Sequence, residues 1–141
     1  MARRVTRAIA KTARSKTKTS RQGGDSRGAA ARIVRIWSAR ATVNGAKKYI
    51  THFRRKVSPQ LQRITGYRGA LLLRRGENQE IEVQVLTFWD SLAAIRRFAG
   101  ADFDKAVVED EAQAVLQDFD RRVVHCQVVL DTQNSLRVNW R

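Results

Sequence analysis

The feature that most constrains the fold is a strand-to-helix switch between residues 80 and 100. Apolar residues first alternate with polar ones, as in a strand with one buried face, at Ile81, Val83 and Val85. After Trp89, Asp90 or Ser91 offers a side-chain oxygen that can cap a helix. Apolar residues then recur at helical spacing, at Leu92, Ile95 and Phe98, and Gly100 ends the helix. Trp89 therefore lies at a strand-to-helix junction, as part of the core or as the wall of a pocket.

The rest of the chain places further elements around this switch. The patterns predict strands at 32–40, 67–75, 80–89 and 119–130, helical segments at 44–57, 59–64 and 91–100, and short helical pieces at 102–108 and 111–117. Thr42 or Asn44 can cap the first helix, and Pro59 starts a new helical segment because it lacks an N–H. The order β-α-β-β-α-β predicts an α+β, ferredoxin-like domain with a four-stranded antiparallel sheet and helices on one face.

Charge divides the chain into a domain and two tails. Residues 1–28 carry nine Lys or Arg against one Asp and are poor in large apolar residues, which predicts a disordered basic tail. A weak anion-binding arm, a transit peptide and a start codon assigned too far upstream are the alternatives. Residues 29–131 form the predicted domain, and residues 132–141 form a polar C-terminal tail.

The predicted sheet has one face that no helix covers, and its strands carry apolar residues on that face. A second copy of the chain would cover it, so we expect a homodimer. Residues 30–76 hold twelve Lys or Arg and no acid, whereas residues 77–131 hold twelve acids. This division favours internal and subunit complementarity over nucleic-acid binding, and the basic tail lacks the interleaved aromatics of a nucleic-acid arm.

The cysteine content, the hydropathy and the histidine content limit the cellular compartment and the kinds of site that the chain can have. The single cysteine, Cys126, excludes an intrachain disulfide, fits a reducing compartment and lies in an apolar run that favours a buried thiol. No apolar run is long enough for a membrane span, so we expect a cytoplasmic protein without membrane contact. The two histidines, His52 and His125, are too few for an ordinary metal site unless carboxylates help, and no spacing suggests that they do, so we predict no metal.

Three motifs resemble the antibiotic biosynthesis monooxygenase (ABM) domain family of dimeric α+β barrel proteins. They are Tyr49-x-x-His52-Phe53, Gly66-Tyr67-x-Gly69-Ala70-x-Leu72-Leu73-Arg74-Arg75, and Val85-Leu86-Thr87-x-Trp89-x-Ser91-x-x-Ala94-Ile95. The resemblance covers residues 32–130. It implies two sheets packed across a two-fold axis, with a pocket between each sheet and its helices.

The resemblance also bears on chemistry. Trp89 falls on the tryptophan that lines the pocket in the haem-degrading branch of the family. The haem-ligand histidine of that branch is missing, because the matching stretch reads Phe103-Asp104-Lys105-Ala106-Val107, and Trp37 or Ser38 stands near the place of its asparagine. Haem degradation is therefore disfavoured, and the cofactor-independent oxygenases of the family become the closer comparison.

Two functions from different classes remain. The first is a cofactor-independent monooxygenase acting on a small aromatic or polycyclic substrate, with no cofactor. Its pocket residues would be Trp37, Tyr49 and Trp89, and its donor or base would be His52 or His125. The second is a non-catalytic, dimeric ligand-binding or stress-associated protein of the same fold.

Overall fold

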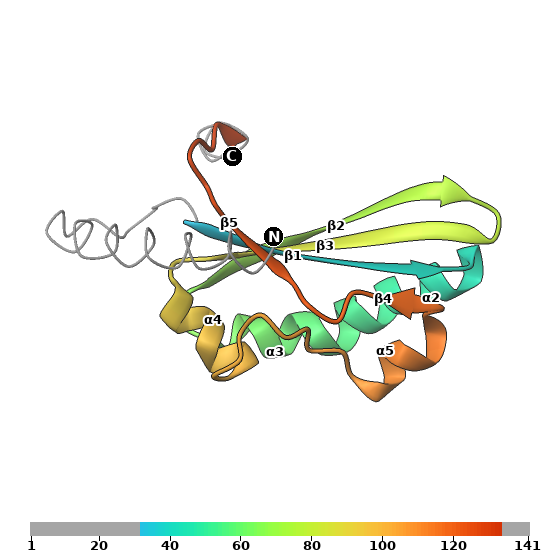
Figure 1. The fold of residues 1–141 in the computed structure, drawn as a ribbon, viewed down its shortest axis with the longest axis horizontal. Helices are drawn as coiled ribbons and strands as arrows, with labels where there is room; N and C mark the ends of the chain where they lie inside the picture. The colour runs from blue at the N-terminus through green and yellow to red at the C-terminus, as the bar shows by residue number, and fades with distance from the viewer. Residues whose placement is uncertain (1–31, 134–141) are drawn as a thin grey trace, which may run out of the picture.

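A computed structural model describes residues 32–133 (Figure 1). The predicted tail 1–28, and all of the segment 132–141 beyond its first two residues, lie outside these residues. The elements are β1 (Ile33–Ala41), α2 (Val43–His52), the π-helical turn η1 (Phe53–Val57), α3 (Ser58–Gln62), β2 (Tyr67–Glu77), β3 (Glu80–Trp89), α4 (Leu92–Ala99), α5 (Asp110–Val115), β4 (Asp118–Phe119) and β5 (Val124–Gln127). Within the described range, no helix is long and apolar enough to cross a membrane.

The strands form one antiparallel sheet in the order β2-β3-β1, with β4 and β5 both pairing with the free edge of β1. The helices between residues 43 and 115 lie on one face of this sheet (Figure 1). This is the ferredoxin-like α+β fold predicted from the order of elements, and β1 lies inside the sheet, between β3 and the two short strands. The strands predicted at 67–75 and 80–89 pair as a long β2–β3 hairpin, with Tyr67 opposite Trp89 and Glu77 opposite Glu80.

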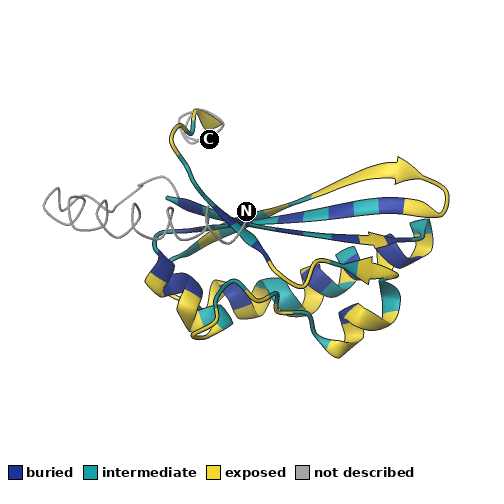
Figure 2. Ribbon diagram, viewed as in Figure 1, coloured by how far each residue is buried: buried dark blue, intermediate teal, exposed yellow. Residues whose placement is uncertain are grey.

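The core lies between the sheet and the helices, because every second residue of β1 and β3 points toward the helices. Figure 2 shows this alternation as buried positions along both strands. Most buried side chains on this face are apolar, including Ile33, Ala39, Ile81, Val83 and Trp89. Three buried side chains are polar or charged: Arg35, Thr87 and His125. Buried polar groups of this kind need partners, so their contacts point to the functional region.

Both predicted helix caps are present. Of the two candidates for each cap, Thr42 caps α2 and Ser91 caps α4. The Thr42 hydroxyl accepts a hydrogen bond from the Gly45 N–H, and the Ser91 hydroxyl accepts one from the Ala94 N–H. Gly45 also allows α5 to pack close to α2, because a Cβ atom at this position would lie 2.4 Å from the carbonyl oxygen of Val115. This close packing brings the start of α5 toward the end of α2.

Pro59 begins a new helical segment, as predicted, and a π-helical turn precedes it. The Ser58 N–H bonds the carbonyl of Phe53, five residues back, instead of the carbonyl four residues back. Proline has no N–H and its ring crowds the carbonyl of the preceding turn, so a regular α-helix is disfavoured there. The wider turn removes this conflict and keeps the chain helical.

Two predicted elements are wrong in detail. Residues 102–108 form turns and extended chain instead of a helix, and the predicted strand 119–130 is split into β4 and β5. Both differences have one cause, because these segments pair with each other: the Ala106 N–H bonds the Arg121 carbonyl, and the Val123 N–H bonds the Asp104 carbonyl. The chain between β4 and β5 therefore leaves the edge of β1.

Candidate functional site

A cavity of about 90 Å³ lies between the sheet and α2, η1, α3 and α5. Its lining includes six side chains that can bind or react with a ligand: Arg35, Trp37, Tyr49, His52, Thr87 and Glu109. Most of the remaining lining is apolar, for example Phe53, Val85 and Val123. A mostly apolar cavity with a few polar groups is the usual form of a small-molecule site.

Two aromatic residues form one wall of the cavity. Trp37 and Tyr49 are both buried, and their rings pack with centroids 5.7 Å apart. The Trp37 indole N–H donates to the Asp120 carbonyl at 2.7 Å, which fixes the orientation of the ring. Burial, and secondly the negative charge of Glu109, raises the pKa of Tyr49. The Tyr49 hydroxyl therefore stays protonated at neutral pH and can act as a donor.

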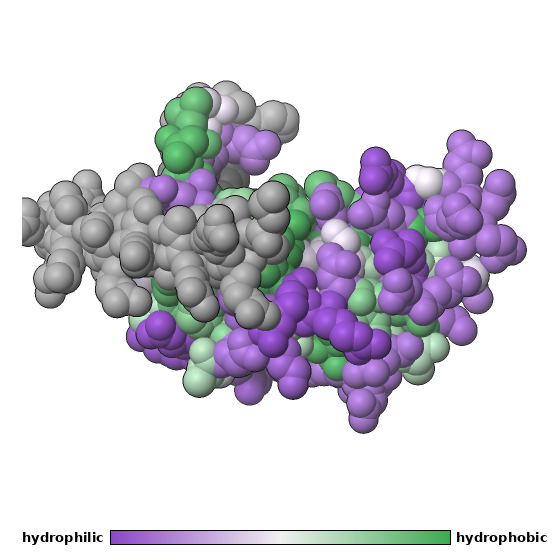
Figure 3. Space-filling view, viewed as in Figure 1, coloured by the Kyte–Doolittle hydropathy of each residue, from purple (hydrophilic) through white to green (hydrophobic). Residues whose placement is uncertain are grey.

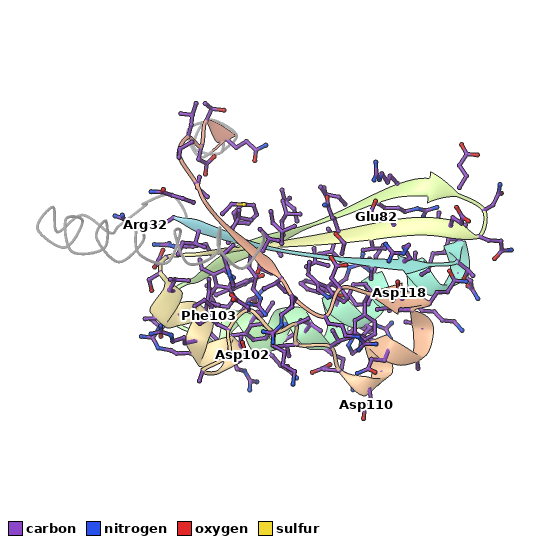
Figure 4. All side chains as sticks on the ribbon, in the orientation of Figure 1. Arg32, Glu82, Asp102, Phe103, Asp110 and Asp118 are labelled. Atoms are coloured by element: carbon purple, nitrogen blue, oxygen red, sulfur yellow. The ribbon has the colours of Figure 1, made fainter. Side chains whose placement is uncertain are left out.

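A buried guanidinium reaches the cavity from β1. Arg35 is 5% exposed and donates to the carbonyls of Phe103 and Lys105, at 2.5 and 2.9 Å. Figure 4 labels Phe103 on the segment beneath the sheet. Burial lowers the pKa of Arg35 to about 10, while the charge of Asp104 opposes this shift. The group is thus positively charged at neutral pH, so a ligand in the cavity meets a fixed cation.

His125 supports this guanidinium from β5. It is fully buried, and its Nε2 lies 3.1 Å from an Arg35 amino group. Because a guanidinium can only donate, Nε2 must be the acceptor, which assigns the proton of the neutral ring to Nδ1. Burial, together with the charge of Arg35, lowers the pKa of His125 to about 3. His125 is therefore neutral, and its 3.6 Å approach to Asp104 is not an ion pair. We call Arg35, His125 and the segment 103–105 the Arg35 cluster.

The second histidine lies among carboxylates on the more exposed side of the cavity. His52 ends α2, and its Nε2 is 3.0 Å from Glu109 while its Nδ1 is 3.8 Å from Glu111. The side chains of these glutamates are 39% and 63% exposed, whereas that of His52 is 9% exposed. We call these three residues the His52 cluster. A carboxylate beside an imidazole fixes the orientation of the ring.

Trp89 lies in the core and does not line the cavity. It is fully buried between Tyr67, at a centroid distance of 5.2 Å, and Phe98, at 5.8 Å. Its indole N–H donates to the Thr87 hydroxyl at 2.8 Å, and Thr87 does line the cavity. Trp89 therefore acts on the cavity through Thr87.

Of the five residues predicted for the site, Trp37, Tyr49 and His52 line the cavity. Trp89 and His125 do not line it, but each contacts a residue that does: Trp89 contacts Thr87, and His125 contacts Arg35. Sequence reasoning missed Arg35, although the alternation of β1 places it on the same face as Ile33 and Trp37. It also missed Glu109, which no local pattern links to His52.

A second depression, of about 480 Å³, lies at the hairpin end of the sheet and suits an aromatic ligand less well. Its lining holds two ion pairs, Arg40 with Asp118 and Arg75 with Glu82, each at 2.6 Å, and no aromatic residue. Figure 4 labels Glu82 and Asp118 in this region, and Figure 3 shows mainly hydrophilic side chains around the hairpin end. Surface ion pairs of this kind need no ligand.

The fold and the cavity together define the class, which is a ferredoxin-like α+β protein with an aromatic cavity between the sheet and its helices. No protein-family model matches the chain, and no curated protein is significantly similar to it.

Solved structures show a distant similarity. The chain is similar to the ActVA-Orf6 monooxygenase of Streptomyces coelicolor in complex with nanaomycin D (15% identity, 72% of this chain and 88% of that chain, TM-score 0.49). It is also similar to the haem degrader MhuD of Mycobacterium tuberculosis, with two haems bound in its active site (23% identity, 71% of this chain and 98% of that chain, TM-score 0.47). A third similar structure is that of SnoaB, a cofactor-independent oxygenase from Streptomyces nogalater (17% identity, 72% of this chain and 96% of that chain, TM-score 0.43). At these identities and TM-scores the similarity assigns no activity to this chain.

Proposed function

We propose that this chain is a cofactor-independent monooxygenase of the ABM type that oxidises a small aromatic substrate. The observation that carries the proposal is a buried cation, Arg35, in the wall of an apolar cavity that also contains His52. The three sequence motifs that resemble the ABM family support it. The cavity volume favours a single ring inside, with any further rings extending through its more exposed side.

The chemistry requires an electron-rich substrate anion, because O₂ has no metal or flavin to activate it in such a mechanism. His52 would remove a proton from an acidic position of the substrate, and Glu109, 3.0 Å away, would stabilise the imidazolium that forms. Arg35 would stabilise the negative charge of the substrate anion. In the balanced reaction one atom of O₂ enters the product and the other leaves as water. In an anthrone a CH₂ group becomes C=O, and in a hydroquinone a ring C–H becomes C–OH while the ring is oxidised to the quinone.

The other predicted residues have supporting roles in this proposal. Trp37 and Tyr49 would hold the ring, and the protonated Tyr49 hydroxyl could donate to a substrate oxygen. His125 would position Arg35 and take no part in proton transfer, because its pKa of about 3 makes it a poor base at neutral pH. Trp89 would orient Thr87.

One observation favours the non-catalytic alternative, a dimeric ligand-binding or stress-associated protein. Both ring nitrogens of His52 face glutamates, at 3.0 and 3.8 Å, instead of the interior of the cavity. A base in this orientation would have to turn before it could reach a substrate. Binding in the cavity requires no such movement.

Oxygen consumption separates these two functions. Purified protein, shown to be free of metal and flavin, is mixed with a panel of hydroquinones and anthrones under ¹⁸O₂, and the products are analysed by mass spectrometry. We expect oxygen uptake with one ¹⁸O atom in the product. Arg35→Gln should weaken binding of the anionic substrate by roughly tenfold or more, because charged hydrogen bonds contribute about 1.5 to 3 kcal/mol. Ligand binding without oxygen uptake would support the binding protein and contradict the oxygenase.

We also propose that the protein is a homodimer, joined through the helix-free face of the sheet. The registers of β1, β2, β3 and β5 place eight apolar or weakly polar residues on this face: Val34, Ile36, Leu71, Leu73, Leu86, Phe88, Val124 and Cys126. Leu71 and Leu73 are each 45% exposed in the single chain. Contiguous apolar surface of this kind typically marks an interface.

Sedimentation velocity tests the dimer. We expect a dimer at micromolar concentration, and we expect Leu86→Glu to produce monomers because it places a charge in the apolar face. Thr51→Glu, at an exposed position on α2, adds the same charge away from this face and is the control. A wild-type monomer at micromolar concentration would contradict the proposed assembly.

A further inference from the structure

The His52 cluster has the composition of a metal site. One nitrogen or oxygen atom from each of His52, Glu109 and Glu111 lies within 4.8 Å of the other two. Two of these residues come from the start of α5 and one from the end of α2, and the close packing at Gly45 holds the two helices together. One imidazole nitrogen and two carboxylate oxygens suit Zn²⁺ or Mn²⁺.

A second observation points to a ligand at this cluster. The His52 side chain is nine-tenths buried, and its Nε2 is a buried atom without a hydrogen-bond partner among the described residues. The nearest acceptor, Glu109 Oε1, is 3.0 Å away but lies outside hydrogen-bond geometry. A buried polar atom without a partner is costly, and coordination to a metal would satisfy it.

We propose that His52, Glu109 and Glu111 bind one divalent transition-metal ion at the exposed side of the cavity. Ligand atoms around a tetrahedral Zn²⁺ are roughly 3.4 Å apart, given bonds of about 2.1 Å. The Nε2 to Glu109 distance of 3.0 Å is close to this spacing, and Glu111 reaches it by a change of rotamer of an exposed side chain. Water completes the coordination.

One positive group opposes this site. Lys56 Nζ lies 3.9 Å from the same Glu111 oxygen and must move when the ion binds. Its side chain is 59% exposed, so it can move into solvent at little cost. The alternative interpretation is that His52 and the two glutamates interact only with one another and bind no ion.

Titration calorimetry of the tag-free full chain with ZnCl₂ alone separates these interpretations. We expect one Zn²⁺ per chain, binding that weakens on acidification because protons compete for the ligands, and weak binding of Mg²⁺, which prefers oxygen ligands. Glu109→Gln and Glu111→Gln should each weaken Zn²⁺ binding by roughly 10-fold or more, since changes even beyond the direct ligands cost about 10- to 100-fold.

Asp110→Asn is the matched control, because Asp110 lies between the two glutamates in sequence, is exposed, and is labelled on the outer side of α5 in Figure 4. It removes the same charge and should leave binding unchanged. An equal loss with Asp110→Asn, wild-type affinity in His52→Gln, or no Zn²⁺ binding by the wild type would each overturn the proposal. The glutamates are partly exposed, so their variants test it even if His52→Gln fails to fold. A metal-bound His52 cannot also remove a proton, so the ion-bound chain would lack the proposed oxygenase activity. Binding of the bare ion is measured directly and does not rest on that activity.

Discussion

The two histidines occupy opposite electrostatic environments in one small cavity region. His125 is fully buried beside a guanidinium, and its low pKa keeps it neutral. His52 lies at the more exposed side, between the carboxylates of Glu109 and Glu111. The same side chain is therefore an acceptor that holds Arg35 in one cluster and a candidate base or metal ligand in the other. The neighbours of each ring decide its role, since environment sets which protonation state is stable.

The largest expected effect comes from removing each imidazole in turn. His125→Ala should lower the free energy of unfolding by about 3 kcal/mol, because it leaves a cavity beside Phe103 and removes an acceptor from Arg35. His52→Ala should cost about 1 kcal/mol, because His52 Nε2 makes no hydrogen bond among the described residues and the neighbouring glutamates are partly exposed. Urea unfolding of both variants measures the difference. Equal losses would contradict the contrast between the two clusters.

Acid should destabilise the protein through His125. Its folded pKa of about 3 lies below its ordinary value of 6.5, so the unfolded chain binds the proton more readily in this range. Stability is therefore complete above about pH 6.5 and decreases toward pH 3, by about 2 kcal/mol at pH 5. Melting temperatures between pH 7 and pH 5 test this. His125→Gln should flatten the slope, and an unchanged slope would assign the acid sensitivity to another group.

Trp89→Phe tests whether the buried Trp89 side chain contributes to stability or to ligand binding. The change removes the hydrogen bond to Thr87 and some ring volume, which should cost about 1 to 2 kcal/mol of stability. Ligand binding should change less than stability, because Trp89 affects the cavity only through the orientation of Thr87. Thermal melts and ligand titration measure the two effects. A large loss of affinity with unchanged stability would show that Trp89 contacts the ligand.

The smallest effect is expected at the exposed side. Lys56 and Glu111 are 59% and 63% exposed and 3.9 Å apart, so Lys56→Met should change stability by less than about 0.5 kcal/mol. The same variant should bind Zn²⁺ at least as tightly as wild type, because it removes the competing cation. Urea unfolding and calorimetry measure both quantities, and weaker Zn²⁺ binding would contradict the proposed geometry.

Local patterns predicted the fold well where each element depends on its own residues. The alternation in residues 80–89, the cap before Leu92 and the position of Pro59 all appear in the structure. The predictions failed where distant segments meet. Residues 102–108 were predicted as helical, but the carbonyls of Phe103 and Lys105 accept hydrogen bonds from Arg35, and the Ala106 N–H bonds Arg121.

In the candidate site, too, residues recognisable from local sequence were predicted, and contacts between distant segments were not. Trp37, Tyr49 and His52 were found because aromatic and imidazole side chains are recognisable in sequence. Arg35 was overlooked because a charged residue in a strand is usually assigned to the solvent face. The pairing of His52 with Glu109, 57 positions later, depends on how α5 packs against α2, which no local pattern records. Trp89 shows that a motif can place a residue correctly in the fold without placing it in the cavity.

The π-helical turn has a consequence for insertions and deletions. A π turn accommodates one residue more than an α-helical turn, and each residue of an α-helix rotates the chain by about 100°. Removing one exposed residue, such as Arg55, would allow η1 to become regular α-helix, and the helical segments on either side would keep their faces because the π turn holds the extra residue within one turn. Phe53 and Val57, which both line the cavity, would then be three residues apart and would still share one helix face. A one-residue deletion should therefore be tolerated at this turn, whereas the same deletion within α2 would rotate the residues on its two sides by about 100° relative to each other.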